Sequence, residues 1–289
     1  MRWWTYQKER FPLFANGLLI AAFSACALLY SSFLSKGPLP GPAMFLIAFV
    51  TCFIFFLQLR IADEFKDAEE DATYRPYRPV PSGLIKLREL GWIFVLGAII
   101  QLTLALWFSP QLLFILLFAW TYLALMSVEF FRRDWLNARP ITYLWTHMLI
   151  MPFVDLYATA CYWQPTLDAP PSGLIWFLAA SFTNGLVIEL GRKIRLPENE
   201  EPGVSTYSKL WGTNRAAWIW VGCLTATFSF AFIAASQIGT QLQTAIILGT
   251  ALALSTILSQ PGKRLELLSA LWTLALYLTL GILPLLLES

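Results

Sequence analysis

The chain has 289 residues, of which 57% are hydrophobic and only 13% are charged. A soluble globular protein carries about 25% charged residues, so this chain has too few polar side chains to cover a surface that faces water. A soluble fold is therefore excluded, and the net charge of +2 gives no reason to expect a nucleic-acid partner.

Apolar runs recur along the whole chain. Runs of about 17–25 mostly apolar residues are typical of helices that cross a lipid bilayer. The sequence predicts nine such spans, at 11–34, 42–62, 90–108, 111–128, 141–162, 174–190, 216–235, 244–259 and 267–287. We therefore expect one all-α integral membrane domain over residues 1–289, with no separate soluble domain and no cleavable signal peptide.

The charged residues gather on one side of these spans. Every Lys and Arg except Lys36 falls in the segments 1–10, 60–89, 129–140, 191–215 and 260–266. So does every acid except Asp155, Asp168, Glu288 and Glu189, and Glu189 lies at the end of its span on this same side. Loops rich in Lys and Arg stay in the cytosol. The sequence thus predicts a cytosolic N-terminus and a cytosolic functional face, in the plasma (inner) membrane.

The segment that follows the second span reads DEFKDAEEDATYRPYRPVPSG. If the span continues as a helix, Asp63, Asp67 and Asp71 lie within about 80° of one another on one face. Like charges at this spacing repel each other, so a positive partner is expected. Carboxylates at a membrane border suit Mg²⁺, which is commonly held by one or two carboxylates together with substrate phosphate. Glu64 is close enough to join them.

The prolines in the second half of this segment stiffen the chain around Arg78. A guanidinium group meets phosphate oxygens with two parallel hydrogen bonds, so a rigid Arg78 beside the acids suits diphosphate binding. The alternative is an acidic loop that faces water and is balanced by Arg75 and Arg78.

These residues carry a resemblance to a known family. DEFKDAEED followed by RPVPSG resembles the signature of the UbiA superfamily of intramembrane prenyltransferases, which is Asn-Asp-x-x-Asp-x-x-x-Asp and then Arg-Pro-hydrophobic-Pro-Ser-Gly. Asp63 takes the Asn place, Glu64 the first Asp place, and Asp67 and Asp71 the other two. The resemblance implies helices around a central cavity, with two acidic motifs on the cytosolic side, after the second and sixth spans.

The second motif corresponds to NGLVIELGRKIRLPENEEPGVSTYSKLWG. Glu189 falls at the first acidic place and Glu198 at a later one, whereas the middle acid of the family pattern is missing. Arg192, Lys193 and Arg195 stand where the family has few cations. They either take over part of the charge neutralisation that metal gives elsewhere or simply anchor the chain at the cytosolic side.

The resemblance implies a set of roles. Catalytic residues would be Asp63, Asp67, Asp71 and Glu189; ligands of Mg²⁺ would be Asp63, Glu64, Asp67, Asp71, Glu189 and Glu198; and the diphosphate would be bound by Arg78, Arg132, Arg133, Arg192, Lys193 and Lys209. Asn184, Asp155 and Tyr207 are candidates for the cavity. An acid within a span is costly in lipid, so Asp155 faces either the cavity or a structural partner such as Tyr157, Thr159 or His147.

The function that follows is Mg²⁺-dependent ionisation of an isoprenoid diphosphate and transfer of the prenyl group to a hydrophobic acceptor. A membrane terpene cyclase, in which the cation is attacked by its own distant double bond, is the first alternative. A divalent-cation transporter that uses the carboxylates as its mouth is the second.

Overall fold

The structure is a computed structural model that describes residues 2–167, 169–259 and 263–288. In this part of the chain, seven helical stretches are long and apolar enough to cross a membrane. They are α2 (Leu13–Ser35), α3 (Pro42–Lys66), α5 (Leu87–Phe108), α10 (Leu174–Arg192), α12 (Thr213–Gln237), α13 (Gln241–Leu258) and a C-terminal run made of α14 (Lys263–Tyr277), η3 (Leu278–Ile282) and α15 (Leu283–Glu288). The all-α membrane architecture is thus confirmed.

The predicted count of nine spans is not confirmed. The predicted span 111–128 corresponds to α6 (Leu112–Ser127), which is apolar but shorter than the other spans. The predicted span 141–162 is divided at Leu149 into α8 (Pro140–Met148) and α9 (Ile150–Thr166).

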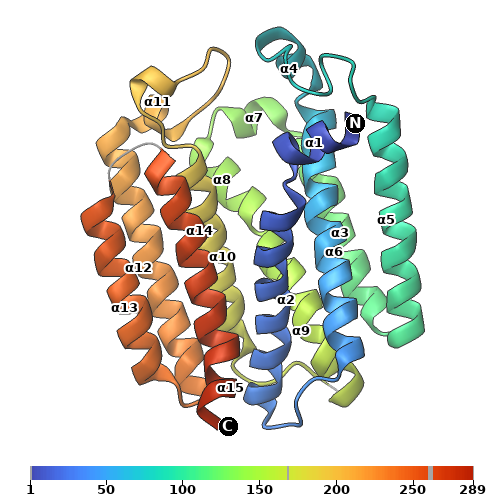
Figure 1. The fold of residues 1–289 in the computed structure, drawn as a ribbon, viewed down its shortest axis with the longest axis vertical. Helices are drawn as coiled ribbons and strands as arrows, with labels where there is room; N and C mark the ends of the chain where they lie inside the picture. The colour runs from blue at the N-terminus through green and yellow to red at the C-terminus, as the bar shows by residue number, and fades with distance from the viewer. Residues whose placement is uncertain (1, 168, 260–262, 289) are drawn as a thin grey trace.

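The short helices α1 (Arg2–Arg10), α4 (Ala68–Tyr74), α7 (Arg133–Asn137) and α11 (Tyr207–Trp211) all lie at one end of the bundle, whereas the C-terminus lies at the other (Figure 1). Two further helical turns lie just before two of these helices: η1 (Glu129–Phe131) precedes α7, and η2 (Pro197–Asn199) precedes α11. We call this the charged end. Four of the five predicted charged segments meet there, and residues 260–262 of the fifth lie outside the described residues.

The bundle is held together at its centre by α2, which packs against α3, α9 and η3, and by α10, which packs against α9, α12 and α14. Polar side chains inside the bundle find partners there. The Trp220 indole N–H donates to the Ser269 hydroxyl at 3.0 Å and to the Val187 carbonyl at 3.1 Å. Such internal bonds matter because lipid offers no water to satisfy a polar group.

The element η3 is a π-helical segment within the last span. Gly281 in this segment packs directly on α2, because a Cβ at that position would lie 2.5 Å from the Cα atom of Cys26. Small residues allow two membrane helices to approach this closely. Gly281 therefore sets the separation between the first and last spans.

We expect Gly281→Ala to lower the melting temperature of the detergent-solubilised protein, because over-packing a closely fitted contact costs about 1–3 kcal/mol. Gly222→Ala in α12 is the matched control, since its new Cβ meets no atom within 4 Å. That control should be neutral or slightly stabilising, because Ala is the better helix former. Equal melting temperatures for the two variants would contradict the role of Gly281.

Candidate active site

The first acidic segment begins at the end of α3. This helix ends at Lys66 and α4 begins at Ala68, so the predicted continuous helix is interrupted at Asp67. The Asp67 N–H still donates to the Asp63 carbonyl at 2.9 Å, and the Asp71 N–H to the Asp67 carbonyl at 2.8 Å. The chain therefore nearly keeps helical register, but the acids of the motif have different surroundings.

Glu64 is buried against arginines. Its side chain pairs with Arg10 Nε at 2.6 Å and with Arg60 Nη2 at 3.4 Å, and the residue is only 2% exposed. Sequence reasoning assigned no role to Arg10 or Arg60. Arg60 lies one helical turn before Glu64, a spacing that could have revealed this pair, whereas the approach of Arg10 depends on where the end of α1 lies in space.

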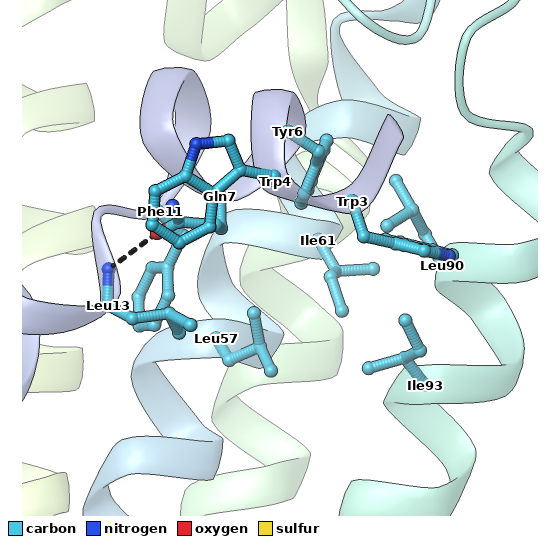
Figure 2. Close-up of a pocket in the computed structure, with 10 residues that line it drawn as sticks. All are labelled: Trp3, Trp4, Tyr6, Gln7, Phe11, Leu13, Leu57, Ile61, Leu90 and Ile93. Carbon is cyan, nitrogen blue, oxygen red and sulfur yellow. Dashed lines mark hydrogen bonds between the residues drawn. The ribbon is translucent and has the colours of Figure 1, made fainter. Parts of the chain in front are cut away.

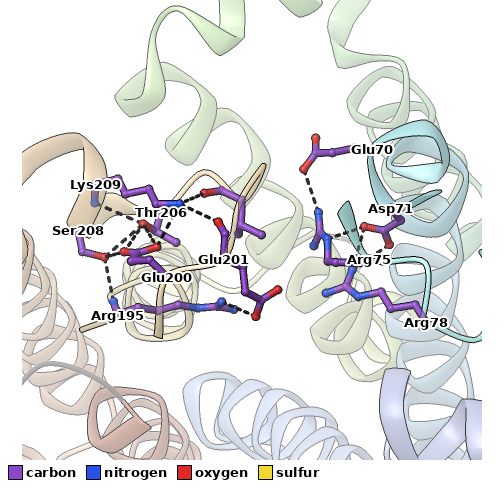
Figure 3. A network of polar contacts seen from close by, with 11 residues as sticks. Glu70, Asp71, Arg75, Arg78, Arg195, Glu200, Glu201, Thr206, Ser208 and Lys209 are labelled. Atoms are coloured by element: carbon purple, nitrogen blue, oxygen red, sulfur yellow. Dashed lines mark hydrogen bonds and ion pairs between the residues drawn. The ribbon is translucent and has the colours of Figure 1, made fainter. Parts of the chain in front are cut away.

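Asp71 is bound in the same manner (Figure 3). Its carboxylate receives Arg78 Nη1 at 2.8 and 3.0 Å and lies 2.9 Å from Arg75 Nε. A third guanidinium, that of Arg10, lies 3.9 Å away and so connects Asp71 with Glu64. Arg78 is therefore held by an acid of the same motif.

Asp63 and Asp67 are less fully compensated. Asp63 is partly exposed, and its ion pair with Arg60 is long, at 3.9 Å. Burial raises the pKa of Asp67; Lys66 lowers it, while the neighbouring acids Asp63, Glu70 and Asp71 raise it further. A bound cation would relieve this repulsion.

Lys66 does not neutralise Asp67 fully, because it is turned towards another acid. Its Nζ donates to the Tyr143 hydroxyl at 2.8 Å and lies 3.2 Å from Glu129 Oε1. Glu129 is also 3.1 Å from His147 Nε2. Burial alone would raise the pKa of Glu129, but the hydrogen bond from His147 and the charges of Lys66 and His147 lower it to about 2.

The second motif places its cations around Glu189. Arg192 Nη2 and Lys193 Nζ bind the two carboxylate oxygens of Glu189 at 2.6 and 2.8 Å. Both cations are thus held by an acid of their own motif.

The loop after α10 is organised by its own polar contacts (Figure 3). Glu200 accepts hydrogen bonds from Thr206 at 2.7 Å and Ser208 at 2.7 Å. Lys209 Nζ donates to the Glu201 carbonyl at 2.7 Å, so this predicted diphosphate ligand also fastens the loop. The predicted metal ligand Glu198 is exposed on η2, and Tyr207 is buried and stacked on Trp211 with ring centres 4.9 Å apart.

This loop also touches the first motif. Gly203 has a positive φ of 71°, and a Cβ there would overlap the ring of Tyr74 at the end of α4. Glycine is the residue that adopts this backbone conformation readily. The two acidic segments are thus joined across the charged end by a direct contact.

Asp155 and Asn184 lie deeper in the bundle. Asp155 is fully buried, and its Oδ2 accepts a hydrogen bond from the Tyr277 hydroxyl at 3.5 Å, so this partner comes from α14 rather than from the nearby residues considered above. Asn184 Oδ1 accepts from the Thr273 hydroxyl at 3.2 Å. A role for either side chain towards substrate stays a prediction.

Two hollows open at or near the charged end. One, of about 350 Å³, lies between α1, α3 and α5 and is almost wholly apolar (Figure 2). The other, of about 470 Å³, is lined by Val128, Phe131, Arg132, Arg133, Asp134 and Trp135. Among the described residues, neither the Arg132 nor the Arg133 guanidinium has a hydrogen-bond or ion-pair partner, so neither contacts an acid of the two motifs.

The charge arrangement bears on Mg²⁺. In the part of the chain that the structure describes, no group of three or more His, Cys, Asp or Glu side chains converges as a metal site. Three of the predicted ligands, Glu64, Asp71 and Glu189, are bound by arginine or lysine. Asp63 and Asp67 still fit the common mode of Mg²⁺ binding, which uses one or two carboxylates with substrate phosphate.

The comparison with protein families gives a clear result. Residues 18–263 match the UbiA prenyltransferase family, and the chain belongs to this family. It is thus a membrane protein of the prenyltransferase type.

Solved structures have the same fold. The apo structure of a UbiA homolog from Aeropyrum pernix K1 aligns with a TM-score of 0.70 at 13% identity, over 93% of this chain and 97% of that chain. A structure described for digeranylgeranylglyceryl phosphate synthase in membranes aligns with a TM-score of 0.63 at 16% identity, over 99% and 98% of the two chains. No curated protein matches the sequence.

The depressed pKa of Glu129 predicts an acid-sensitive contribution to stability. Because the pKa falls from 4.5 to about 2 on folding, this contribution is complete above about pH 4.5 and is lost as the pH falls towards 2. Glu129→Gln should therefore destabilise the protein at pH 6 and have a smaller effect near pH 3. The measurement is thermal unfolding in detergent at both values. A pH-independent difference between wild type and variant would contradict the assignment.

Proposed function

We propose that this protein is an intramembrane enzyme that ionises an isoprenoid diphosphate and transfers the prenyl group to a hydrophobic acceptor. The observation that carries the proposal is the meeting of the two motifs at the charged end, where Gly203 of the second segment packs against the ring of Tyr74 at the end of α4. Membership of the UbiA prenyltransferase family supports the type of reaction.

The basic residues suit a leaving group whose negative charge grows. In the proposed reaction, the bond between the allylic carbon and its oxygen breaks, and its electron pair leaves with the diphosphate. Arg78, Arg192 and Lys193 are fixed by carboxylates at 2.6–2.8 Å, so they need little reorganisation to receive that charge. An electron pair of the acceptor then forms the new bond to the allylic carbon, and the acceptor releases a proton.

Mg²⁺ fits this scheme at Asp63 and Asp67, the two acids of the first motif with the weakest compensation. When bound, the ion supplies charge neutralisation for the diphosphate. Under this proposal Glu64, Asp71 and Glu189 act mainly as positioning residues that orient Arg10, Arg60, Arg78, Arg192 and Lys193. Arginine-bound acids also weigh against the cation transporter, because the entrance then offers few free carboxylates.

The orientation is part of the proposal. Because the charged end carries nearly all Lys and Arg residues, we place it and the N-terminus in the cytosol, with the protein in the plasma membrane. The diphosphate would then enter from the cytosolic side, while the prenyl chain extends among the apolar helices. Aromatic contacts below this end, such as Phe23 with Phe56 at 5.4 Å, suit a passing cation.

The first test separates transfer from cyclisation. Purified protein is incubated with Mg²⁺ and prenyl diphosphates of increasing chain length, with and without a lipid extract that supplies acceptors. We expect diphosphate release that depends on the extract. Cyclic hydrocarbons formed without any acceptor would instead identify a terpene cyclase.

Removing either weakly compensated carboxylate should stop turnover. We expect Asp63→Asn and Asp67→Asn to lower kcat by at least about a hundredfold, because losing leaving-group stabilisation of several kcal/mol costs a factor of ten per 1.36 kcal/mol. Glu69→Gln, an exposed acid of the same segment, is the control. Diphosphate release is the readout, and near-normal rates in both Asp variants would rule out this site.

The GRKIR segment gives a separate prediction. If Arg192 and Lys193 bind diphosphate, Arg192→Gln and Lys193→Gln should each weaken donor binding about tenfold, since a charge-assisted hydrogen bond contributes about 1.5–3 kcal/mol. Arg88→Gln, an exposed cation at the start of α5, is the control. If all three variants bind the donor equally well, the two residues are topological anchors.

A further inference from the structure

The connection between α6 and α7 has an unusual backbone. Glu129, Phe130 and Phe131 have φ values of 51°, 51° and 57°, so three successive non-glycine residues form a left-handed turn. The turn is closed by hydrogen bonds from the Phe131 N–H to the Val128 carbonyl at 3.0 Å and from the Arg132 N–H to the Glu129 carbonyl at 2.9 Å. A left-handed residue other than glycine costs about 1–2 kcal/mol, so the surroundings must hold this turn.

The inner side of the turn is firmly anchored. Buried Glu129 accepts from the Tyr143 hydroxyl at 3.1 Å and pairs with Lys66 and His147. The ring of Phe130 packs edge-on against Tyr122, with ring centres 5.6 Å apart. At the end of the turn the side chains point outward, and Phe131 is 78% exposed.

The outer side forms the hollow of about 470 Å³. Arg132 and Arg133 reach it without a hydrogen-bond or ion-pair partner among the described residues. Arg139 lies 4.4 Å from the centre of the Trp135 ring and donates to the Trp135 carbonyl at 3.1 Å. The balance of charge is positive, since one acid, Asp134, faces the same hollow as the two free arginines.

We propose that this hollow binds the phosphate group of a membrane phospholipid. The turn joins the apolar helix α6 to α7 and α8 at the charged end of the bundle. Arg132 and Arg133 bind the phosphate oxygens, while the exposed rings of Phe131 and Trp135 lie at the level of the lipid headgroups. Asp134 repels additional negative charge, so the site suits a single phosphodiester rather than a diphosphate. This inference does not depend on the proposed function.

The test is a lipid titration of the detergent-solubilised protein, followed by native mass spectrometry. The probe is short-chain phosphatidylglycerol, and diacylglycerol with the same chains is the phosphate-free reference. The double variant Arg132→Gln/Arg133→Gln is compared with Arg88→Gln/Arg215→Gln, which removes the same charge from two other exposed positions. We expect at least fivefold weaker phosphatidylglycerol binding in the first variant, less than twofold in the second, and no binding of diacylglycerol at this site.

Several results would overturn the inference. Equal losses in the two double variants would mean that only net charge matters. Displacement of the lipid by inorganic phosphate at equal concentration would identify a site for free phosphate rather than for a lipid. If the Arg132→Gln/Arg133→Gln variant binds the lipid as before but binds prenyl diphosphate more weakly, both arginines belong to the diphosphate site. Melting temperatures of both variants show whether a loss of binding reflects a loss of fold.

Discussion

The structure of the charged end depends on how the carboxylates at the ends of the membrane helices are neutralised. A buried carboxylate without a partner is strongly unfavourable, and removing one partner of a buried pair leaves an uncompensated charge. Glu64 and Asp71 meet this requirement with guanidinium groups from both sides of the motif, and Arg10 lies between them. The N-terminal helix is thereby connected to the second span, and the loop that carries Arg78 is connected to the helix that precedes it.

The same requirement distributes the remaining charges. Lys66 contacts Tyr143 and Glu129, so its side chain is turned away from Asp67. Glu129 is also the first residue of the left-handed turn that precedes Arg132 and Arg133. Glu189 gathers Arg192 and Lys193 at the end of α10. One set of acids is used to orient cations, and a second, smaller set is left weakly paired. Under the proposed function, that division allows the charged end to receive an anionic ligand.

The membrane part of the chain follows a different rule. In lipid, helices gain little from burying apolar side chains against one another, so close packing and internal hydrogen bonds decide their arrangement. Gly281 against Cys26 and the Trp220 bonds to Ser269 and Val187 are contacts of this kind. The buried pair of Asp155 and Tyr277 belongs with them, because an acid at that depth requires a partner from a neighbouring helix.

The amino-acid sequence by itself determined the class of fold and the end of the bundle at which the charged residues gather. Hydropathy reports the cost of placing each residue in lipid, and the bias of Lys and Arg reports which loops stay on one side, so both can be read without coordinates. The spacing of Asp63, Asp67 and Asp71 likewise follows from helical periodicity, although the break at Asp67 does not.

Only the tertiary structure decided how the charged residues pair. A run of acids and arginines is compatible with many pairings, and the choice depends on distances between segments far apart in the chain. Arg10 with Glu64, Lys66 with Glu129, and Asp155 with Tyr277 are separated by 54, 63 and 122 positions, so no local pattern could select them. The helical packing brings these groups within a few ångströms, where the electrostatic energy becomes large enough to fix the choice.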